Sequence, residues 1–279
     1  MLKSRIHIIL IIVLLLAGAV QLSAQTVPPK ADEGKLIAVL KSSDATHKEK
    51  VDACRGLALI ATDKSIAPLA ALLSDEKLSH MARYALETIK DPAVDEVFRD
   101  ALSKLKGMPL VGVIGSVGVR RDAKAVESLT SMLQDSNPEV AQAAARALGS
   151  IGNVSAMMVL VKSMREVGGI NELPAANKLS FCEGLLRCAE NLAAEGKRDL
   201  AIELYEALIF VDDVHQVRSG ALRGAILTRG KDGIPLLQKH LRSDSYIMFS
   251  AACQAALEMP GEEVTKALTS ALKDLPADS

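Results

Sequence analysis

One short segment constrains the fold of this chain more than any other feature. Residues 138–152 read PEVAQAAARALGSIG, with Pro138 at the start, apolar residues at helical spacing and Gly152 at the end. Proline is favoured in the first turn of a helix and glycine just beyond the last turn. The spacing therefore predicts an amphipathic helix that ends at Gly152. A helix this short is not stable alone and must bury its apolar stripe against neighbours.

The same pattern returns at intervals near thirty residues. From Asp135, Leu148 lies 13 residues on and Gly152 lies 17 on, and apolar or small residues stand at the same offsets from Asp44, Asp213 and Asp244. The segment 114–118 (IGSVG) matches 148–152 (LGSIG) position for position. The repeat frame aligns Leu57, Leu86, Ile114, Leu148, Ile226 and Leu257. A period of this length, filled by two helical patterns, is typical of a solenoid of stacked helix pairs.

Composition supports the same fold class. Hydrophobic residues make up 49% of the chain but aromatic residues only 3%, with no tryptophan. Such a core is built from thin, interlocking helices, which argues against a β-sandwich. We therefore expect an all-α chain, a right-handed superhelix of antiparallel helix pairs.

The N-terminus has the pattern of a secretory signal peptide over residues 1–24. Lys3 and Arg5 precede an apolar run over residues 8–20, and small residues offer cleavage sites after Ala24 or Ala19. The run is shorter than the ~20 apolar residues that a spanning helix needs. We expect export to the periplasm or beyond, without stable membrane insertion after cleavage. An uncleaved anchoring helix is the alternative.

The remaining chain divides by regularity. We expect a linker over residues 25–34, about four helix pairs over 35–152, a less regular helical segment over 153–212 that continues the solenoid, and further pairs with a capping helix over 213–272, before a tail over 273–279. Four prolines fall in first helical turns in this register, as helices require: Pro68, Pro92, Pro138 and Pro235. Ser65 is a candidate N-cap.

These segments resemble the HEAT repeat, in its short alanine-rich, phycobilisome-lyase-like form. The resemblance rests on Asp135 and on residues 147–152 (ALGSIG), and covers roughly residues 35–152 and 213–272. It implies an α-solenoid that binds other proteins along the concave surface of its second helices. Some relatives attach bilin pigments, a chemistry that nothing in this sequence supports specifically. In the middle, residues 196–209 place Ala201, Tyr205 and Leu208 on one face, which resembles the second helix of a tetratricopeptide unit.

A search for an active site gives no catalytic, cofactor-binding or metal-binding residues. The histidines do not have metal-ligand spacing, and the sequence has no Cys-x-x-Cys, HExxH or Gly-x-Ser-x-Gly motif. Gly112, Gly115 and Gly118 do not match a phosphate loop, and we interpret them as sites of close helix packing. Cysteines 54, 182, 188 and 253 are expected to be four buried, reduced thiols that act as small hydrophobic side chains.

The surface carries the functional prediction. Without Lys3 and Arg5 the chain has 31 basic and 34 acidic residues, a net charge of −3, which favours neither nucleic acid nor an anionic membrane as partner. Arginine and tyrosine are frequent anchors of interfaces, and eight polar residues of the second helices form the predicted binding face: Arg55, His80, Arg83, Tyr84, Arg146, Arg218, Arg223 and Tyr246. They favour an acidic or carboxylate-bearing protein partner.

Two functions remain open from the sequence. The first is a monomeric, non-catalytic scaffold that binds another protein along these residues. The second is an accessory subunit or lyase-like factor of an exported enzyme, with its chemistry in residues 153–212. For any single one of these residues the simpler alternative is an intrahelical salt bridge or a turn cap.

Overall fold

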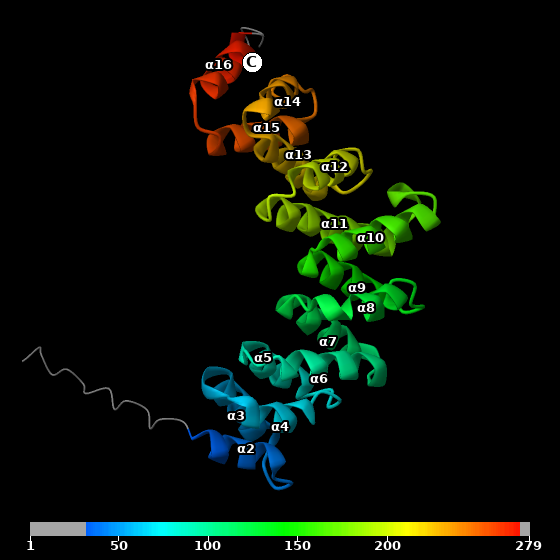
Figure 1. Cartoon of the computed structure of the whole chain (residues 1–279), viewed down its shortest axis with the longest axis vertical. Coiled ribbons are helices and arrows are strands. Elements are labelled where there is room, and N and C mark those ends of the chain that lie inside the picture. The colour runs from blue at the N-terminus through cyan, green and yellow to red at the C-terminus, as the bar shows by residue number, and fades with distance from the viewer. Residues whose placement is uncertain (1–31, 274–279) are drawn as a thin grey trace, which may run out of the picture.

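The computed structural model describes residues 32–273. Within that range every regular element is a helix, and the helices pair and stack in chain order into one elongated, bowed rod (Figure 1). This confirms the predicted all-α solenoid. The predicted signal peptide, residues 25–31 of the predicted linker and the tail after Lys273 lie outside the described residues. The last two linker residues, Glu33 and Gly34, instead belong to the first turn of a helix that Asp32 caps.

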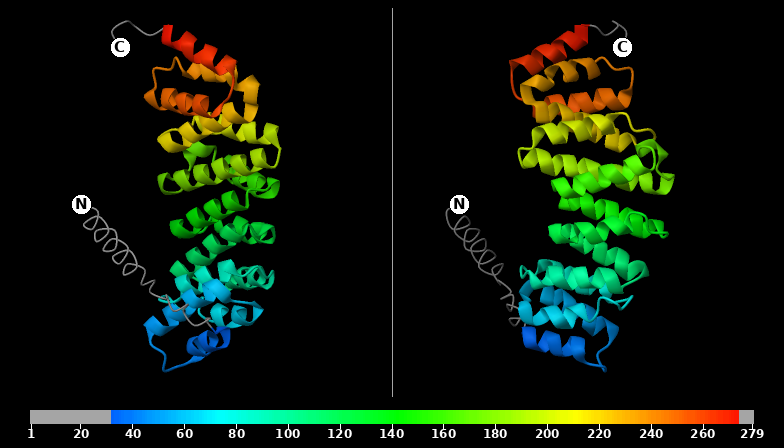
Figure 2. Two further views of the ribbon diagram at one scale, coloured as in Figure 1. Left: turned by 90° about the vertical axis from the view of Figure 1, so that its left-hand side faces the viewer. Right: turned by 45° about the vertical axis from the view of Figure 1, so that its right-hand side comes forward.

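Each repeat contributes a first and a second helix, which appear as successive rungs in Figure 2. The first helices are α2 (Glu33–Lys41), α4 (Ile66–Ala70), α6 (Ala93–Lys104), α8 (Val126–Met132), α10 (Val154–Glu166), α12 (Arg198–Ile209) and α14 (Ile234–His240). The second helices are α3 (His47–Ile60), α5 (Ser79–Thr88), α7 (Gly107–Arg120), α9 (Pro138–Ile151), α11 (Ala175–Ala194), α13 (His215–Arg229) and α15 (Tyr246–Glu258). Helix α16 (Glu262–Lys273) packs on α14 and closes the described array.

Local signals set the ends of α9 as the sequence predicts. Asn137 caps the helix by accepting the Glu139 N–H at 2.9 Å, and Pro138 occupies the first helical position. Gly152 ends the helix in the left-handed region, with φ 64°, where a side chain other than glycine's costs about 1–2 kcal/mol. Before the cap, Asp135 accepts the Asn137 N–H at 2.8 Å, which explains why an aspartate marks this turn.

Neighbouring second helices run parallel. Arg83 of α5 donates to the Gly112 carbonyl of α7 at 3.0 Å, and Glu87, one turn further on, accepts from the Ser116 hydroxyl at 2.6 Å. Both contacts join residues 29 apart in sequence. The contacts therefore advance in the same direction along both helices. Equivalent turns of successive second helices are separated by about thirty residues of sequence, which is the repeat period.

The helices approach closely because their facing residues are small. A Cβ atom built on Gly149 of α9 would lie 2.5 Å from the Gly184 carbonyl oxygen of α11, and one built on Gly184 would lie 2.5 Å from the Ala145 carbonyl oxygen. These backbones leave no room for a methyl group. The repeat frame fills the space between pairs with fully buried aliphatic side chains: Leu57, Leu86, Ile114, Leu148 and Ile226.

Leu257 departs from the predicted repeat frame, because its side chain is 87% exposed. Helix α15 buries a stripe from Met248 through Ala252 to Ala256. Nine residues separate Met248 from Leu257, which at 3.6 residues per turn places them on roughly opposite sides of the helix. The turn at Asp244 stands where the repeat period places it. Helix α15, however, is rotated about its own axis relative to the frame, so that the predicted core position of Leu257 faces solvent.

The matching segments 114–118 and 148–152 also end differently. Gly152 terminates α9, whereas Gly118 lies inside α7, which continues to Arg120. A Cβ atom on Gly118 would lie 2.9 Å from the Ala147 Cα atom. Gly118 therefore permits the close approach of α7 and α9, as predicted, and the left-handed stop falls three residues later, on Arg121 at φ 54°. Gly115, by contrast, faces open space.

The middle of the chain continues the stack with one change of geometry. Helix α12 follows α11 after a short turn and precedes α13, and the likeness of residues 196–209 to a second tetratricopeptide helix stays a prediction. It packs against both α11 and α13, which contact each other less extensively than α9 and α11 do. Its Tyr205 ring packs on Gly224 of α13, where a Cβ atom would collide with it.

Candidate protein-binding face

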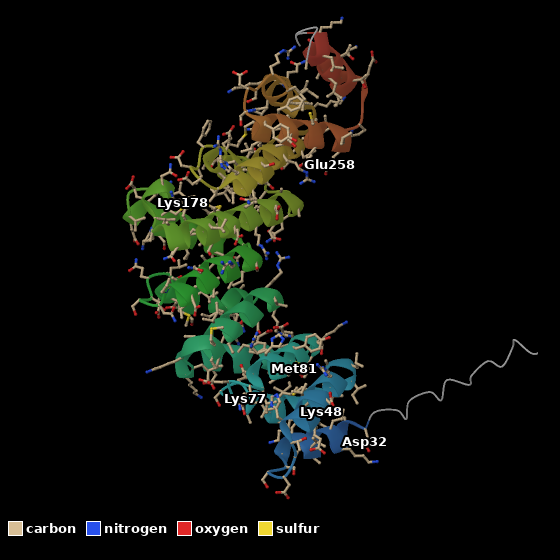
Figure 3. All side chains as sticks on the ribbon, turned by 180° about the vertical axis from the view of Figure 1, so that it is seen from behind. Asp32, Lys48, Lys77, Met81, Lys178 and Glu258 are labelled. Carbon is tan, nitrogen blue, oxygen red and sulfur yellow. The ribbon has the colours of Figure 1, made fainter. Side chains whose placement is uncertain are left out.

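The second helices together form one surface, which we call the second-helix face. Figure 3 places Lys178, in the first turn of α11, and Glu258, at the end of α15, on opposite edges of the rod. Since the second helices run parallel, their C-terminal ends share the edge of Glu258, on the hollow side of the bow. Contacts between adjacent second helices fix the polar side chains on this face.

Three of the predicted arginines are neutralised by carboxylates. Arg55 pairs with Asp52 of its own helix at 3.2 Å. Arg146 of α9 pairs with Glu183 of α11 at 3.1 Å. Arg223 of α13 binds Glu258 of α15 through two hydrogen bonds, one of them 2.6 Å long. This contact raises the pKa of Arg223 and lowers the pKa of Glu258. The last two pairs join successive repeats.

The other two arginines bind backbone carbonyls. Arg218 donates to the carbonyl of Ile209, the last residue of α12, at 2.9 Å. Arg83 lies half-buried over Gly112, and its Nε has no hydrogen-bond partner. Burial lowers the pKa of Arg83, and the nearby Glu87 carboxylate opposes that shift. Both side chains connect helices, and only Arg218, which caps the end of α12, fits the simpler alternative of a turn cap.

The remaining three residues are exposed. His80 and Tyr84 lie on α5, and Tyr246 begins α15. Tyr84 is 50% exposed and Tyr246 is 79% exposed. Among residues 32–273 no hydrogen bond or ion pair joins any two of the eight predicted residues, so the structure distributes them along the face and does not gather them into one site.

Exposed apolar side chains accompany the polar ones on the second helices. Met108 and Val119, at the two ends of α7, are 66% and 65% exposed, and Leu257 and Tyr84 extend the set to α15 and α5. Protein-binding surfaces are enriched in aromatic residues, methionine and arginine, surrounded by a polar rim. The sequence search included Tyr84 but missed Met108, Val119 and Leu257, because it selected residues with polar groups.

Two adjacent grooves lie between α10 and α12, on the first-helix side. Cavities of about 530 Å³ and 320 Å³ share Val161, Arg165, Glu203 and Leu204 among their lining residues. Met157, Met158 and Met164 supply much of the apolar wall. In the part of the chain that the structure describes, no helix is long and apolar enough to cross a membrane, and no three His, Cys, Asp or Glu side chains gather as metal ligands would.

The four cysteines are free thiols. Three are buried as expected, whereas Cys253 is only partly buried. Burial raises the pKa of Cys54 to about 11 and the pKa of Cys182 and Cys188 to about 12. A thiol with so high a pKa is a weak nucleophile at neutral pH, since the thiolate is the reactive form.

Comparison with protein families identifies the repeat type in the centre of the array. A family model described as HEAT repeats matches residues 111–168, from α7 to just after α10. This segment is similar to HEAT repeats. The matched segment includes the ALGSIG motif at residues 147–152, on which the predicted resemblance rests. It also extends into residues 153–212, which we expected to be less regular. No curated protein sequence matches the chain.

Three solved structures cover most of the chain but have low sequence identity and low TM-scores. The complex of CpcE and CpcF of phycocyanin lyase from Nostoc sp. PCC7120 is 20% identical, with 89% of this chain and 91% of that chain covered and a TM-score of 0.42. A designed armadillo repeat protein is 18% identical, covered over 85% of this chain and 100% of its own, at a TM-score of 0.32. An engineered protein is 22% identical, and the match covers 85% of this chain and 99% of that protein at a TM-score of 0.33.

Proposed function

We propose that this chain is an exported, non-catalytic HEAT-repeat scaffold that binds another protein along its second-helix face. One observation carries the proposal: parallel second helices form a continuous face on which apolar side chains such as Tyr84, Met108 and Val119 stay exposed. Extended surfaces of this kind are the binding surfaces of solenoid proteins. Export rests on the signal-like pattern of residues 1–24 alone, and we expect the scaffold to be monomeric.

Site-specific photo-crosslinking in intact cells tests the binding face. A benzoylphenylalanine at Tyr84 is compared with one at Met158, which is 61% exposed on α10 of the first-helix side. We expect one partner protein to crosslink from Tyr84 and not from Met158. Equal crosslinking from both positions, or none from Tyr84, would refute the proposed face. N-terminal sequencing of the exported protein tests cleavage after Ala24 or Ala19, and full-length protein in the cytoplasm would refute export.

A second candidate function is the accessory or lyase-like subunit with chemistry in residues 153–212. The observation that favours it is the pair of methionine-lined grooves between α10 and α12. The absorption spectrum and metal content of purified protein separate the two functions. A bound chromophore or metal supports the accessory subunit, and colourless, metal-free protein supports the scaffold.

A further inference from the structure

One groove on the second-helix face differs from the rest of that surface in its charge. It has a volume of about 450 Å³ and lies where α7 and α9 end beside the second half of α11. Arg121 and Arg187 line it together with Val119, Ser150, Glu190 and Asn191. We call it the Arg121–Arg187 groove.

Both guanidinium groups converge on the last turn of α9. Nη2 of Arg121 donates to the Ile151 carbonyl at 3.4 Å, and Nη1 of Arg187 donates to the Ser150 hydroxyl at 3.2 Å. Asn191 donates to the Gly149 carbonyl in the same turn at 3.3 Å. Three helices thus hold the two cations at adjacent residues of α9.

Neither of these two arginines has an ion-pair partner. Within residues 32–273, no carboxylate oxygen lies within 4.0 Å of the Arg121 or Arg187 guanidinium, in contrast to the pairs of Arg146 and Arg223. A guanidinium has five N–H donors in a planar fork, and each of these two uses one of them on α9. The remaining donors are available to a carboxylate, which matches the fork with two parallel hydrogen bonds.

The backbone at Arg121 is a second, independent observation. The equivalent stop after α9 is Gly152, whereas α7 ends on an arginine in the same left-handed conformation, at φ 54° and ψ 40°. Strained residues of this kind concentrate at functional positions. Arginine at this position therefore places a cation in the groove at the expense of backbone strain that glycine would not have.

We propose that the Arg121–Arg187 groove binds a carboxylate side chain from an acidic segment of the partner protein. An apolar neighbour of that carboxylate packs on Val119, which is exposed at the rim. Glu190 is the carboxylate that lines the groove. Arg121 also contributes to the lowered pKa of Glu195, after the larger effect of Lys197, although no Glu195 oxygen lies within ion-pair distance of the guanidinium. This inference rests on the proposed function, and it replaces the ion-paired Arg146 and Arg223 as the carboxylate-binding residues of the face.

Fluorescence anisotropy with a labelled peptide of alternating leucine and glutamate pairs tests the groove. A second peptide carries glutamine in place of every glutamate. We expect the full chain to bind the glutamate peptide at least about tenfold more tightly than the glutamine peptide, a difference of one charged contact or more. Arg121→Gly and Arg187→Gln each weaken glutamate-peptide binding about tenfold, and Glu190→Gln tightens it.

Arg146→Gln is the matched control, because it removes the same charge from an arginine that is already paired with Glu183. It should change binding less than about twofold. Arg121→Gly should fold at least as well as the parent chain, since glycine suits its backbone. Equal binding of both peptides, or unchanged binding by Arg121→Gly and Arg187→Gln, overturns the inference. Crosslinking of a partner from Tyr84 would in that case still support the proposed function.

Discussion

Two glycines at equivalent motif positions should respond to alanine in opposite ways. Gly115 of IGSVG and Gly149 of LGSIG both lie within second helices, α7 and α9. A Cβ atom on Gly115 meets nothing within 4 Å, whereas one on Gly149 would lie 2.5 Å from the Gly184 carbonyl oxygen. The close carbon–oxygen contacts found in proteins are about 3.3 Å or longer. The Gly184 Cα atom would lie closer still, at 2.4 Å, so Gly149→Ala forces α9 and α11 apart by at least roughly 0.8 Å.

The magnitudes follow from propensity and packing. Alanine gains about 1 kcal/mol over glycine inside a helix, so Gly115→Ala should stabilise the chain by about that amount. Gly149→Ala has the same gain, but overpacking costs about 3 kcal/mol where only backbone can move, which leaves a loss of about 2 kcal/mol. The two variants should thus differ by roughly 6–12 °C in midpoint for a domain of this size. Thermal unfolding followed by circular dichroism at 222 nm measures this difference, and equal midpoints would refute the packing of α9 on α11.

Three further predictions concern stability, pH and thiol reactivity. Arg121→Gly should raise the thermal midpoint or leave it unchanged because it relieves a left-handed arginine; a clear fall would show that the Ile151 contact matters more than the strain. Hydrogen bonds from Ser65 and Thr62 lower the pKa of Glu33 below 4.5 in the folded chain. The contribution of Glu33 to the free energy of unfolding is therefore complete above pH 4.5 and is lost as pH falls through the pKa that Glu33 has in the folded chain. Glu33→Gln should consequently lose less stability than the parent chain between pH 6 and 3.5 in urea titrations, and an equal loss would contradict this assignment. The pKa of Cys188 is raised to about 12 by burial, so at pH 8 a thiol reagent should label it in urea and not in native protein; fast native labelling would contradict its burial.

The sequence predicts the stack because its signals are local and repeated. Helix starts such as Pro138 and stops such as Gly152 act within a few residues, and the aliphatic frame from Leu57 to Ile226 recurs at each turn. Where one signal is weak, as at Leu257, a helix can rotate without changing the repeat length. Sequence spacing fixes the length of a repeat more firmly than the rotation of its helices.

The polar contacts could not be predicted, because they join residues about thirty positions apart. Arg146 and Arg187 both lie in the second half of a second helix, yet only Arg146 has a carboxylate within reach on the next helix. Ser65 reads as a helix cap, but its hydroxyl donates to Glu33 of the preceding repeat at 2.7 Å. Which arginine stays unpaired depends on the register between helices, and that register is set by packing.

The exposure of individual apolar residues could not be predicted from the sequence either. Val119 and Met108 lie in an almost continuous apolar run over residues 108–119, in which sequence alone does not separate buried from exposed positions. In the structure α7 contacts α5, α6 and α9, and these neighbours cover the middle of the run while its ends stay open.

Circular dichroism of the excised central hairpin, residues 122–153, tests the interdependence of the repeats most directly. Helix α9 buries residues on sides that face both α7 and α11, so the hairpin alone would expose most of its apolar surface. We predict little helix and no cooperative thermal transition for the hairpin, against a cooperative transition for the chain. A hairpin that unfolds cooperatively by itself would contradict a continuous face built from mutually dependent repeats.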